Sequence, residues 1–175
     1  MTRREGHLVE LVTTDGHPAG STTVLDAHTA PGQLHRAFSV LLFDGAGRTL
    51  LQQRAAAKTR FPLRWANACC GHPAPAAPVA AAASTRLAEE LGVPGLTLTE
   101  VGVYTYRAAD PETGLVEHEY DHVLVAQVPA DLAFGPDPAE VAQVEWVDRG
   151  ALLAAVDDPR YAPWLAGVLP IALGH

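Results

Sequence analysis

The strongest constraint on the fold is residues 36–43 (RAFSVLLF), a continuous run of mostly apolar side chains. A run of this length and composition is typical of a strand that is buried on both faces of its sheet. Residues 44–47 (DGAG) then supply a turn, and residues 49–53 (TLLQQ) are expected to return as the partner strand of a hairpin. The sequence therefore predicts a sheet whose faces are covered at this hairpin.

An amphipathic helix is expected at residues 79–91, with further strands before and after it. Its apolar side chains recur every four residues and a glycine follows the last of them: Val79, Ala83, Leu87, Leu91 and Gly92. The other expected strands are 8–14, 65–70, 97–107, 116–128 and 141–147, and the other expected helices are 149–156 and 162–173. This order predicts an α/β (α+β) fold, a mixed β-sheet sandwiched between helices, as a single domain over residues 1–175.

The charge and hydropathy of the chain limit its partners. The formal net charge is −8, which argues against a nucleic-acid partner because phosphate backbones require a basic surface. The chain contains no apolar run near the ~20 residues that span a bilayer, and no secretory signal is visible at the N-terminus, so a cytoplasmic protein is expected. A small phosphorylated substrate stays compatible with the charge, since a local basic cluster is enough to bind it.

Two pairs of side chains are candidate metal ligands. His28 and His35 stand on either side of Pro31-Gly32, so a loop, and not helical spacing, must bring them together. Glu117 and Glu119 alternate along an apolar strand and therefore share one face. Two carboxylates on one face repel each other unless a cation or a shared proton stabilises them. Both pairs are also compatible with an ordinary solvated surface.

The segment Cys69-Cys70-Gly71-His72-Pro73 contains the only two cysteines of the chain. In an extended segment Cys70 and His72 project to the same side, and Gly71 allows another group to approach the backbone closely. The alternative is a pair of buried cysteines without chemical function, which is common in protein cores. Neighbouring cysteines seldom bond to each other, so the question is whether one of them is reactive.

A basic cluster precedes this segment. Four of the 12 Lys and Arg residues fall within eleven positions: Arg54, Lys58, Arg60 and Arg64. They indicate either a solvated loop or an anion site suited to a diphosphate. With His72, the candidate ligands number three imidazoles and two carboxylates, a set that suits Mn, Zn, Fe or a similar ion better than Mg²⁺ alone.

In this order the motifs LHRAFS, LLQQR, FP, CCGHP, EELG, YRA, VEHE and PW resemble those of the type 1 isopentenyl-diphosphate isomerases, a branch of the Nudix superfamily. The resemblance extends from about His7 to Trp164 and rests on several separate motifs. It implies a Nudix-like fold and an enzyme of isoprenoid biosynthesis that converts isopentenyl diphosphate to dimethylallyl diphosphate. The substrate partner would be a small prenyl diphosphate, and the protein a monomer or homodimer.

The resemblance also implies a role for each motif residue. The proton-transferring residues would be Cys70 and Glu119, with Tyr106 assisting Glu119. The ligands of one divalent metal (Mn²⁺, Zn²⁺ or Mg²⁺) would be His28, His35, His72, Glu117 and Glu119. A second ion, Mg²⁺ on the diphosphate, would be held by Glu90. The diphosphate would be bound by Arg54, Lys58 and Arg86, and the hydrocarbon end would lie against Trp164.

Two features depart from the family pattern. Members usually carry a lysine four residues before the first metal histidine, where this chain has Val24. The start of the central helix is also unusual, because Ala77 and Ala80 stand near positions that are acidic in relatives. Both changes concern the diphosphate end of the substrate and leave the proton-transfer residues in place.

Two other enzymatic functions compete with isomerisation. A Nudix pyrophosphohydrolase needs a cluster of helix carboxylates for Mg²⁺, but only Glu89, Glu90 and Gly92 of that motif are present, and Ala77 and Arg86 stand where acids are needed. The absent lysine motivates a second alternative, in which the same acid chemistry starts a cyclisation of a longer prenyl diphosphate. A non-catalytic binding module would have no need of Cys70 together with Glu119.

Overall fold

The computed structural model describes residues 4–175. Over this range the elements are β1 (Leu8–Val12), β2 (Pro18–Thr23), α1 (Val24–His28), β3 (His35–Phe43), β4 (Arg48–Arg54), β5 (Trp65–Asn67), β6 (Cys69–Gly71), α2 (Val79–Leu91), β7 (Thr99–Ala109), β8 (Val116–Gln127), β9 (Val141–Asp148), α3 (Arg149–Ala155) and α4 (Leu165–Leu173). None of these helices combines the length and the apolar character that are needed to cross a bilayer.

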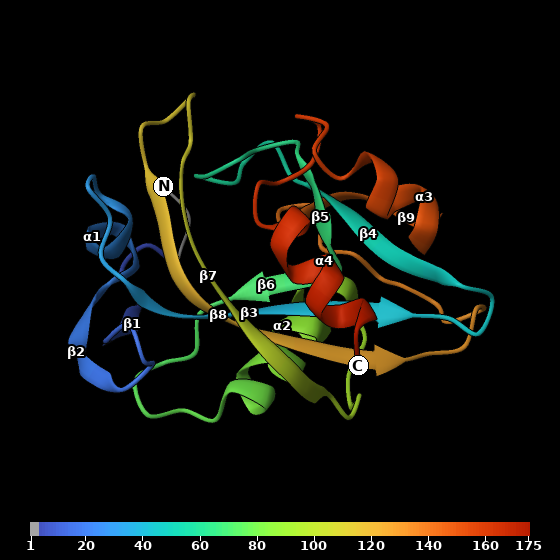
Figure 1. Ribbon diagram of the computed structural model, residues 1–175, viewed down its shortest axis with the longest axis horizontal. Coiled ribbons are helices and arrows are strands. Elements are labelled where there is room, and N and C mark those ends of the chain that lie inside the picture. The colour runs from blue at the N-terminus through green and yellow to red at the C-terminus, as the bar shows by residue number, and fades with distance from the viewer. Residues whose placement is uncertain (1–3) are drawn as a thin grey trace.

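Strand β3 lies at the centre of the sheet (Figure 1). It pairs in parallel with β8, where His35 stands opposite Glu119, and antiparallel with β1, β4 and β6. Strand β7 extends the sheet beyond β8, and β9 pairs with β4. The sheet is therefore mixed, as the order of elements predicts. Strands β6 and β8 lie along the two edges of β3.

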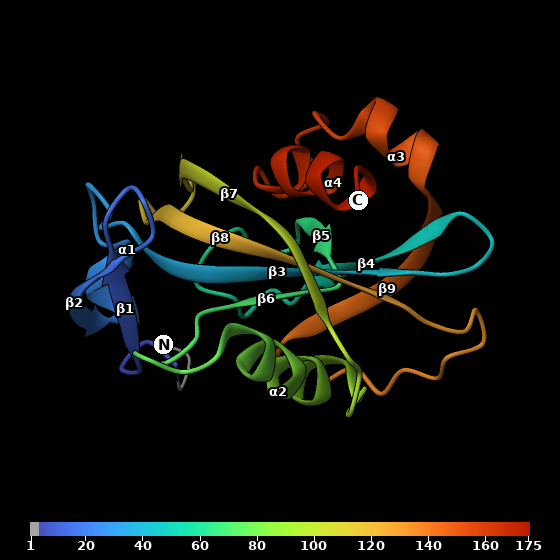
Figure 2. The same cartoon turned by 60° about the horizontal axis from the view of Figure 1, so that its bottom comes forward.

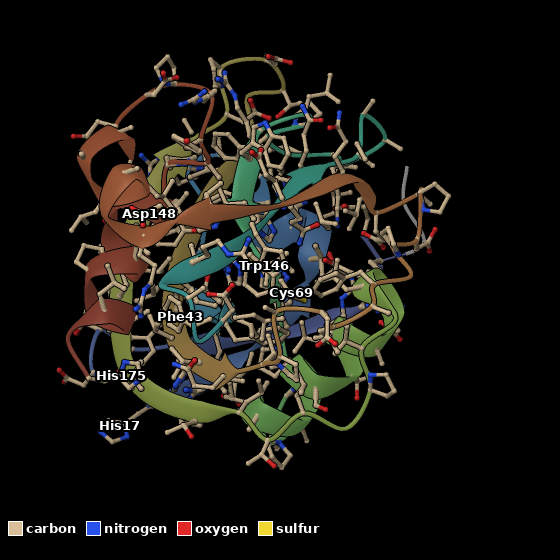
Figure 3. All side chains as sticks on the ribbon, turned by 90° about the vertical axis from the view of Figure 1, so that its right-hand side faces the viewer. His17, Phe43, Cys69, Trp146, Asp148 and His175 are labelled. Carbon is tan, nitrogen blue, oxygen red and sulfur yellow. The ribbon has the colours of Figure 1, made fainter. Side chains whose placement is uncertain are left out.

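Helices cover both faces of the sheet (Figure 2). Helix α2 packs on one face through Ala83, Leu87 and Leu91, while α4 covers the other face. Among the residues labelled in Figure 3, Cys69 belongs to the core beneath α2 and Trp146 packs against that core, whereas Phe43 belongs to the core beneath α4. Strand β3 is apolar and buried on both sides, which confirms the interpretation of residues 36–43. Burial of this apolar surface stabilises both layers.

Two elements were not expected from the sequence. Strand β2 is composed of small and polar residues (PAGSTT) that are mostly exposed, so it carries no alternating pattern. Helix α1 has only five residues and is capped at its N-terminus by Thr23, whose side chain accepts a hydrogen bond from the Asp26 amide. Helix α2 has the predicted bounds, and Gly92 ends it in the left-handed conformation with φ = 68°.

The attachment of α2 can be tested at Leu87, which is fully buried. We expect Leu87→Ala to lower the free energy of unfolding by about 2–5 kcal/mol, because a cavity adds to the lost burial of the side chain. Urea denaturation followed by circular dichroism measures this change. Thr85→Ala, on the exposed face of the same helix, is the matched control and should stay within about 0.5 kcal/mol of the parent. A smaller loss of unfolding free energy for Leu87→Ala than for Thr85→Ala would contradict the packing of α2 on the sheet.

Candidate active site

A cavity of about 110 Å³ opens between the N-terminal segment, β6, β8 and α2. The residues that line it include Arg4, Val24, Arg54, Lys58, Arg60, Cys70, His72, Arg86, Glu90, Tyr106, Glu117, Glu119, Glu140 and Trp164. Nearly all of the residues singled out in the sequence therefore meet in one place. His28 and His35 lie behind the cavity wall and are fully buried.

Five side chains form a compact group that could hold a metal ion: His28, His35, His72, Glu117 and Glu119. One ligand atom from each lies within 4.8 Å of all the others. Helix α1 ends at His28, β3 begins at His35, His72 follows β6, and both glutamates lie on β8. The loop at Pro31-Gly32 brings His28 and His35 to a ring separation of 4.6 Å, as the sequence interpretation requires.

The histidine rings are oriented to present Nε2 to the centre of this group. The Nδ1–H of His28 donates to the Val24 carbonyl (2.6 Å), and that of His35 donates to the Gln33 carbonyl (2.8 Å). In these tautomers Nε2 carries a lone pair, yet Nε2 of His28 lies 2.8 Å from a carboxylate oxygen of Glu117. Such a contact needs positive charge between the two atoms. A proton on Nε2 supplies it in the absence of metal, since Glu117 outweighs burial and raises the pKa of His28, and a metal ion that fits this donor set can replace that proton.

A second observation supports this fit. Nε2 of His35 is buried and has no hydrogen-bond partner among residues 4–175, although it lies 3.6 Å from Glu119. A buried ring nitrogen without a hydrogen-bond partner is unfavourable unless it contacts a bound ligand such as a metal ion. Burial also lowers the pKa of His72 to about 4, against the opposing effect of its Glu119 hydrogen bond, so this imidazole stays neutral near pH 7. A neutral imidazole is the form that ligates metals.

The two glutamates of the group are held as carboxylates. Burial would raise the pKa of Glu119, but the imidazoles of His35 and His72 hold it well below its usual value. The pKa of Glu117 is also lowered, because His28 and Arg60 outweigh burial and the repulsion from Glu119. Arg60 donates to Glu117 over 3.1 Å and thereby balances part of the negative charge.

The two cysteines point to different layers. Cys69 is fully buried in the core beneath α2, whereas Cys70 lines the cavity beside His72, as alternation along an extended segment predicts. The Sγ of Cys70 lies 3.2 Å from Oδ1 of Asn67 and 3.6 Å from Oγ of Ser39. Burial, reinforced by the charge of Asp121, raises the pKa of the Cys70 thiol to about 12. Cys70 is therefore protonated and able to donate a proton into the cavity.

Asn67 fixes the position of this thiol, a role that the sequence interpretation did not assign. Its Nδ2 donates to the carbonyls of Val40 (3.1 Å) and Cys69 (2.9 Å), which determines the orientation of the amide. The opposite oxygen then accepts from Nε1 of Trp164 (3.0 Å) as well as from Cys70. One buried amide thus positions both the thiol and the indole of the cavity.

Aromatic side chains form another wall of the cavity. Tyr106 stands opposite Glu119 in the β7–β8 ladder and donates its hydroxyl to the Oε2 of Glu119 (2.8 Å). Its ring lies 6.2 Å from that of Trp164 and stacks on Tyr104 at 5.4 Å. The hydroxyl stays protonated, because burial and the nearby carboxylates raise the pKa of Tyr106 well above its usual value.

The remaining polar part of the cavity is a network of cations and carboxylates. Lys58 contacts both Glu90 (3.3 Å) and Glu140, and Arg86 contacts the same two carboxylates, with 3.5 Å between Arg86 and Glu140. Glu140 was not singled out in the sequence, since an isolated acid before a strand carries no recognisable pattern. An anionic ligand with more charge than a carboxylate can displace these acids from the two cations.

The four residues of the basic cluster, Arg54, Lys58, Arg60 and Arg64, do not form one group at the cavity. Arg64 does not line the cavity, and Arg60 is paired with Glu5 and Glu117. Arg54 lines it but donates to the carbonyls of Arg60 and Phe61, with its guanidinium 5.3 Å from the Trp164 ring. Lys58 is the member whose ammonium joins the cation–carboxylate network, because Arg54 and Arg60 line the cavity with other partners and Arg64 lies outside its lining.

Comparison with known proteins adds to this geometry. Residues 33–168 match the model of the Nudix domain family. An isopentenyl-diphosphate Delta-isomerase of Nocardia farcinica is 62% identical over 166 residues, which cover 94% of this chain and 93% of that protein. This chain belongs to the isopentenyl-diphosphate Delta-isomerase family. A second member, from Streptomyces coelicolor, is 46% identical over 96% of this chain and 84% of its own length.

Solved structures show the same fold at low sequence identity. The structure of DR0079 from Deinococcus radiodurans superposes with a TM-score of 0.73 at 18% identity, covering 94% of this chain and 98% of that one. A MutT protein of Methanosarcina mazei gives a TM-score of 0.65 at 14% identity, over 81% of this chain and 94% of that one. These likenesses confirm the Nudix fold expected for the isomerase family.

Proposed function

We propose that this chain converts isopentenyl diphosphate to dimethylallyl diphosphate by protonating the alkene and then removing a proton from the neighbouring carbon. The observation that carries the proposal is the meeting of Cys70 and Glu119 in one cavity, with a candidate metal group and a cationic network. High identity to proteins named for this reaction supports it. The fold alone would not, because one fold hosts many functions.

The reaction needs two proton-transferring groups. A proton added to the terminal alkene carbon leaves a tertiary carbocation, and a second proton must then leave from the next carbon on the diphosphate side. Cys70 and Glu119 take these two roles, one as the acid and the other as the base. Tyr106 donates to Glu119 and sets the direction of its Oε2.

The aromatic wall would stabilise the positive charge that forms. The indole of Trp164 lines the cavity, is 3% exposed and is held by Asn67, so its desolvated ring would lie against the carbocation. A cation over an aromatic face gains about 2 kcal/mol. Water would trap the carbocation as an alcohol, so the bound substrate and the aromatic wall would have to exclude it from the reacting carbons.

Two ions complete the proposed site. The group formed by His28, His35, His72, Glu117 and Glu119 would hold one divalent cation, Mn²⁺, Zn²⁺ or Mg²⁺, with its mixed nitrogen and oxygen donors favouring the first two. When bound, this cation supplies positive charge that tunes the acidity of Glu119. Glu90 would hold a Mg²⁺ that accompanies the diphosphate.

The diphosphate serves as a handle for the reacting carbons. Lys58 and Arg86 lie together in the cationic network and would exchange Glu90 and Glu140 for diphosphate oxygens. Arg54 would contribute from beside Trp164. Binding energy at this end holds the alkene in register with the proton-transferring residues.

The two alternative reactions have less support. For hydrolysis, Ala77 and Arg86 still stand where carboxylates are needed, and Arg86 is engaged with Glu90. Cyclisation of a longer prenyl chain is motivated by the absent lysine alone, whereas the relatives at 62% and 46% identity are named for isopentenyl diphosphate.

Product analysis tests the proposal. The purified protein, supplied with Mg²⁺ and Mn²⁺, is incubated separately with isopentenyl diphosphate and with ten- and fifteen-carbon prenyl diphosphates. We expect dimethylallyl diphosphate from the five-carbon substrate and no release of phosphate. Cyclic products from the longer substrates, with no conversion of isopentenyl diphosphate, would overturn the assignment in favour of a cyclase. Release of phosphate alone would indicate a hydrolase.

The removal of the Tyr106 hydroxyl should have a graded effect. Tyr106→Phe deletes the hydrogen bond to Glu119, and hydrogen bonds to charged groups contribute about 1.5–3 kcal/mol, so we expect kcat to fall about 10- to 100-fold. Steady-state kinetics measures the change. Tyr104→Phe, which alters the ring stacked on Tyr106 but no bond to Glu119, should retain kcat. Equal losses in both variants would contradict the role assigned to the Tyr106 hydroxyl.

Three further properties belong to the same proposal. A cytoplasmic location suits a site whose Cys70 must stay reduced, and both cysteines are free. One domain over residues 1–175 suits a sheet that includes strands from Leu8 to Asp148. The small prenyl diphosphate partner suits the cavity, and a monomer or homodimer stays the prediction for assembly.

A further inference from the structure

Val24 lies at the cavity but brings no charge to it. Its side chain is 5% exposed and forms part of the cavity wall. The sequence places no basic residue at positions 23–25, beside the metal-ligating His28, so the cation expected there must come from another segment or be missing.

The N-terminal segment is bound directly against this position. The amide of Val24 donates to the carbonyl of His7 (2.8 Å), and the amide of Leu25 donates to the carbonyl of Glu5 (3.0 Å). A turn is closed by the amide of His7 and the carbonyl of Arg4 (3.0 Å). These backbone bonds anchor Arg4 beside the residue that would otherwise supply the charge.

The side chain of Arg4 reaches the cationic network. Its guanidinium donates to the Oε2 of Glu89 (2.6 Å), and the same oxygen accepts from Arg86 (2.7 Å). Its Nε lies 3.6 Å from Glu140, which also contacts Lys58. Arg4, Arg86 and Lys58 are therefore joined through shared carboxylates, and the side chain of Arg4 stays 37% exposed at the cavity.

We propose that Arg4 is a further cationic contact for the diphosphate, beside Arg54, Lys58 and Arg86, supplied from the N-terminal segment where residue 24 is apolar. The inference rests on the proposed function for the identity of the substrate. Its guanidinium offers several donors in one plane, which matches phosphate oxygens. Glu89 and Glu140 hold the side chain in position until the more highly charged diphosphate displaces them.

Other basic residues near the cavity do not fill this role. Arg60 lies in the cavity wall, but its guanidinium is committed to Glu5 and Glu117. Arg64 does not line the cavity, and Arg54, already proposed for the diphosphate, lies beside Trp164 and not against residue 24. Arg4 is joined to Arg86 and Lys58, the residues already proposed for diphosphate binding.

Kinetics and binding together test this proposal. We expect Arg4→Ala to raise the KM for isopentenyl diphosphate about tenfold with little change in kcat, because binding is weakened equally in the ground and transition states. Titration calorimetry with inorganic pyrophosphate and Mg²⁺ should show a Kd raised by a similar factor, independently of turnover. Arg4→Lys should recover most of the loss. Arg160→Ala removes an exposed arginine outside the cavity and is the matched control, expected to behave as the parent.

A compensating substitution tests the location. Adding Val24→Lys to Arg4→Ala should restore pyrophosphate binding to within about threefold of the parent protein. An Arg4→Ala variant with unchanged KM and Kd, while the parent converts isopentenyl diphosphate, would overturn the inference alone. A parent that converts no isopentenyl diphosphate, but binds pyrophosphate more weakly after Arg4→Ala, would overturn the proposed function and retain Arg4 as an anion contact.

Discussion

Replacement of Cys70 by alanine is expected to reduce kcat for isopentenyl diphosphate by about three to four orders of magnitude. The thiol lines the cavity as a protonated group, held by Asn67 and Ser39. Removing a positioned acid or base typically lowers the rate by a factor of about 10²–10⁴. The KM should change little, because the diphosphate contacts lie elsewhere.

The adjacent cysteine provides a matched control. Cys69 is fully buried in the core beneath α2, so Cys69→Ala should cost about 1 kcal/mol of stability and leave kcat close to the parent value. Steady-state kinetics on folded protein, with thermal unfolding recorded for both variants, separates the two effects. A Cys70→Ala enzyme with more than about a tenth of the parent kcat would contradict the proposed acid–base pair.

Loss of a histidine ligand is expected to remove both the metal and the activity. His35→Ala deletes the buried Nε2 that lacks a hydrogen-bond partner, and we expect metal content to fall from about one ion to near none per chain. Activity should fall at least about 100-fold, because loss of outer-shell partners already costs 10–100-fold in metal affinity or activity. Elemental analysis after dialysis, together with kinetics, measures both quantities.

His118 is the control for the metal site. It lies between Glu117 and Glu119 on β8, but its ring turns toward the carbonyl of Gly32, with Nδ1 at 3.2 Å. His118→Ala should therefore retain the metal. Chelation of the parent protein should also lower its thermal stability, and saturation at a thousand times Kd should restore about 4 kcal/mol. Full activity after complete metal removal would contradict the assignment.

Much of the fold follows from hydropathy patterns. The four-residue spacing of Ala83, Leu87 and Leu91 predicts helix α2, and the apolar run of β3 predicts its place inside the sheet. The short elements β2 and α1 could not be predicted, because β2 is mostly exposed and lacks alternation, and the five residues of α1 are too few for a helical pattern. These elements nonetheless place His28.

The candidate site is predictable where chemistry restricts the residue types. The imidazoles and carboxylates of the metal group, with Cys70, are identifiable by kind and order, and the structure brings them together. The roles of Asn67 and Arg4 depend on contacts across 97 and 85 positions, to Trp164 and to Glu89, which no local pattern encodes. Within the basic cluster, the loop places Arg54, Lys58 and Arg60 at the cavity and Arg64 outside its lining, a difference that the sequence alone does not reveal.

The most direct test of the central claim is the fate of solvent hydrogen. The metal-loaded protein is incubated with isopentenyl diphosphate in deuterated water, and the product is analysed by NMR. We expect deuterium in a methyl group of dimethylallyl diphosphate, with no incorporation in Cys70→Ala or Glu119→Gln. Product without deuterium, or deuterium incorporated equally by the variants, would show that Cys70 and Glu119 do not transfer the protons.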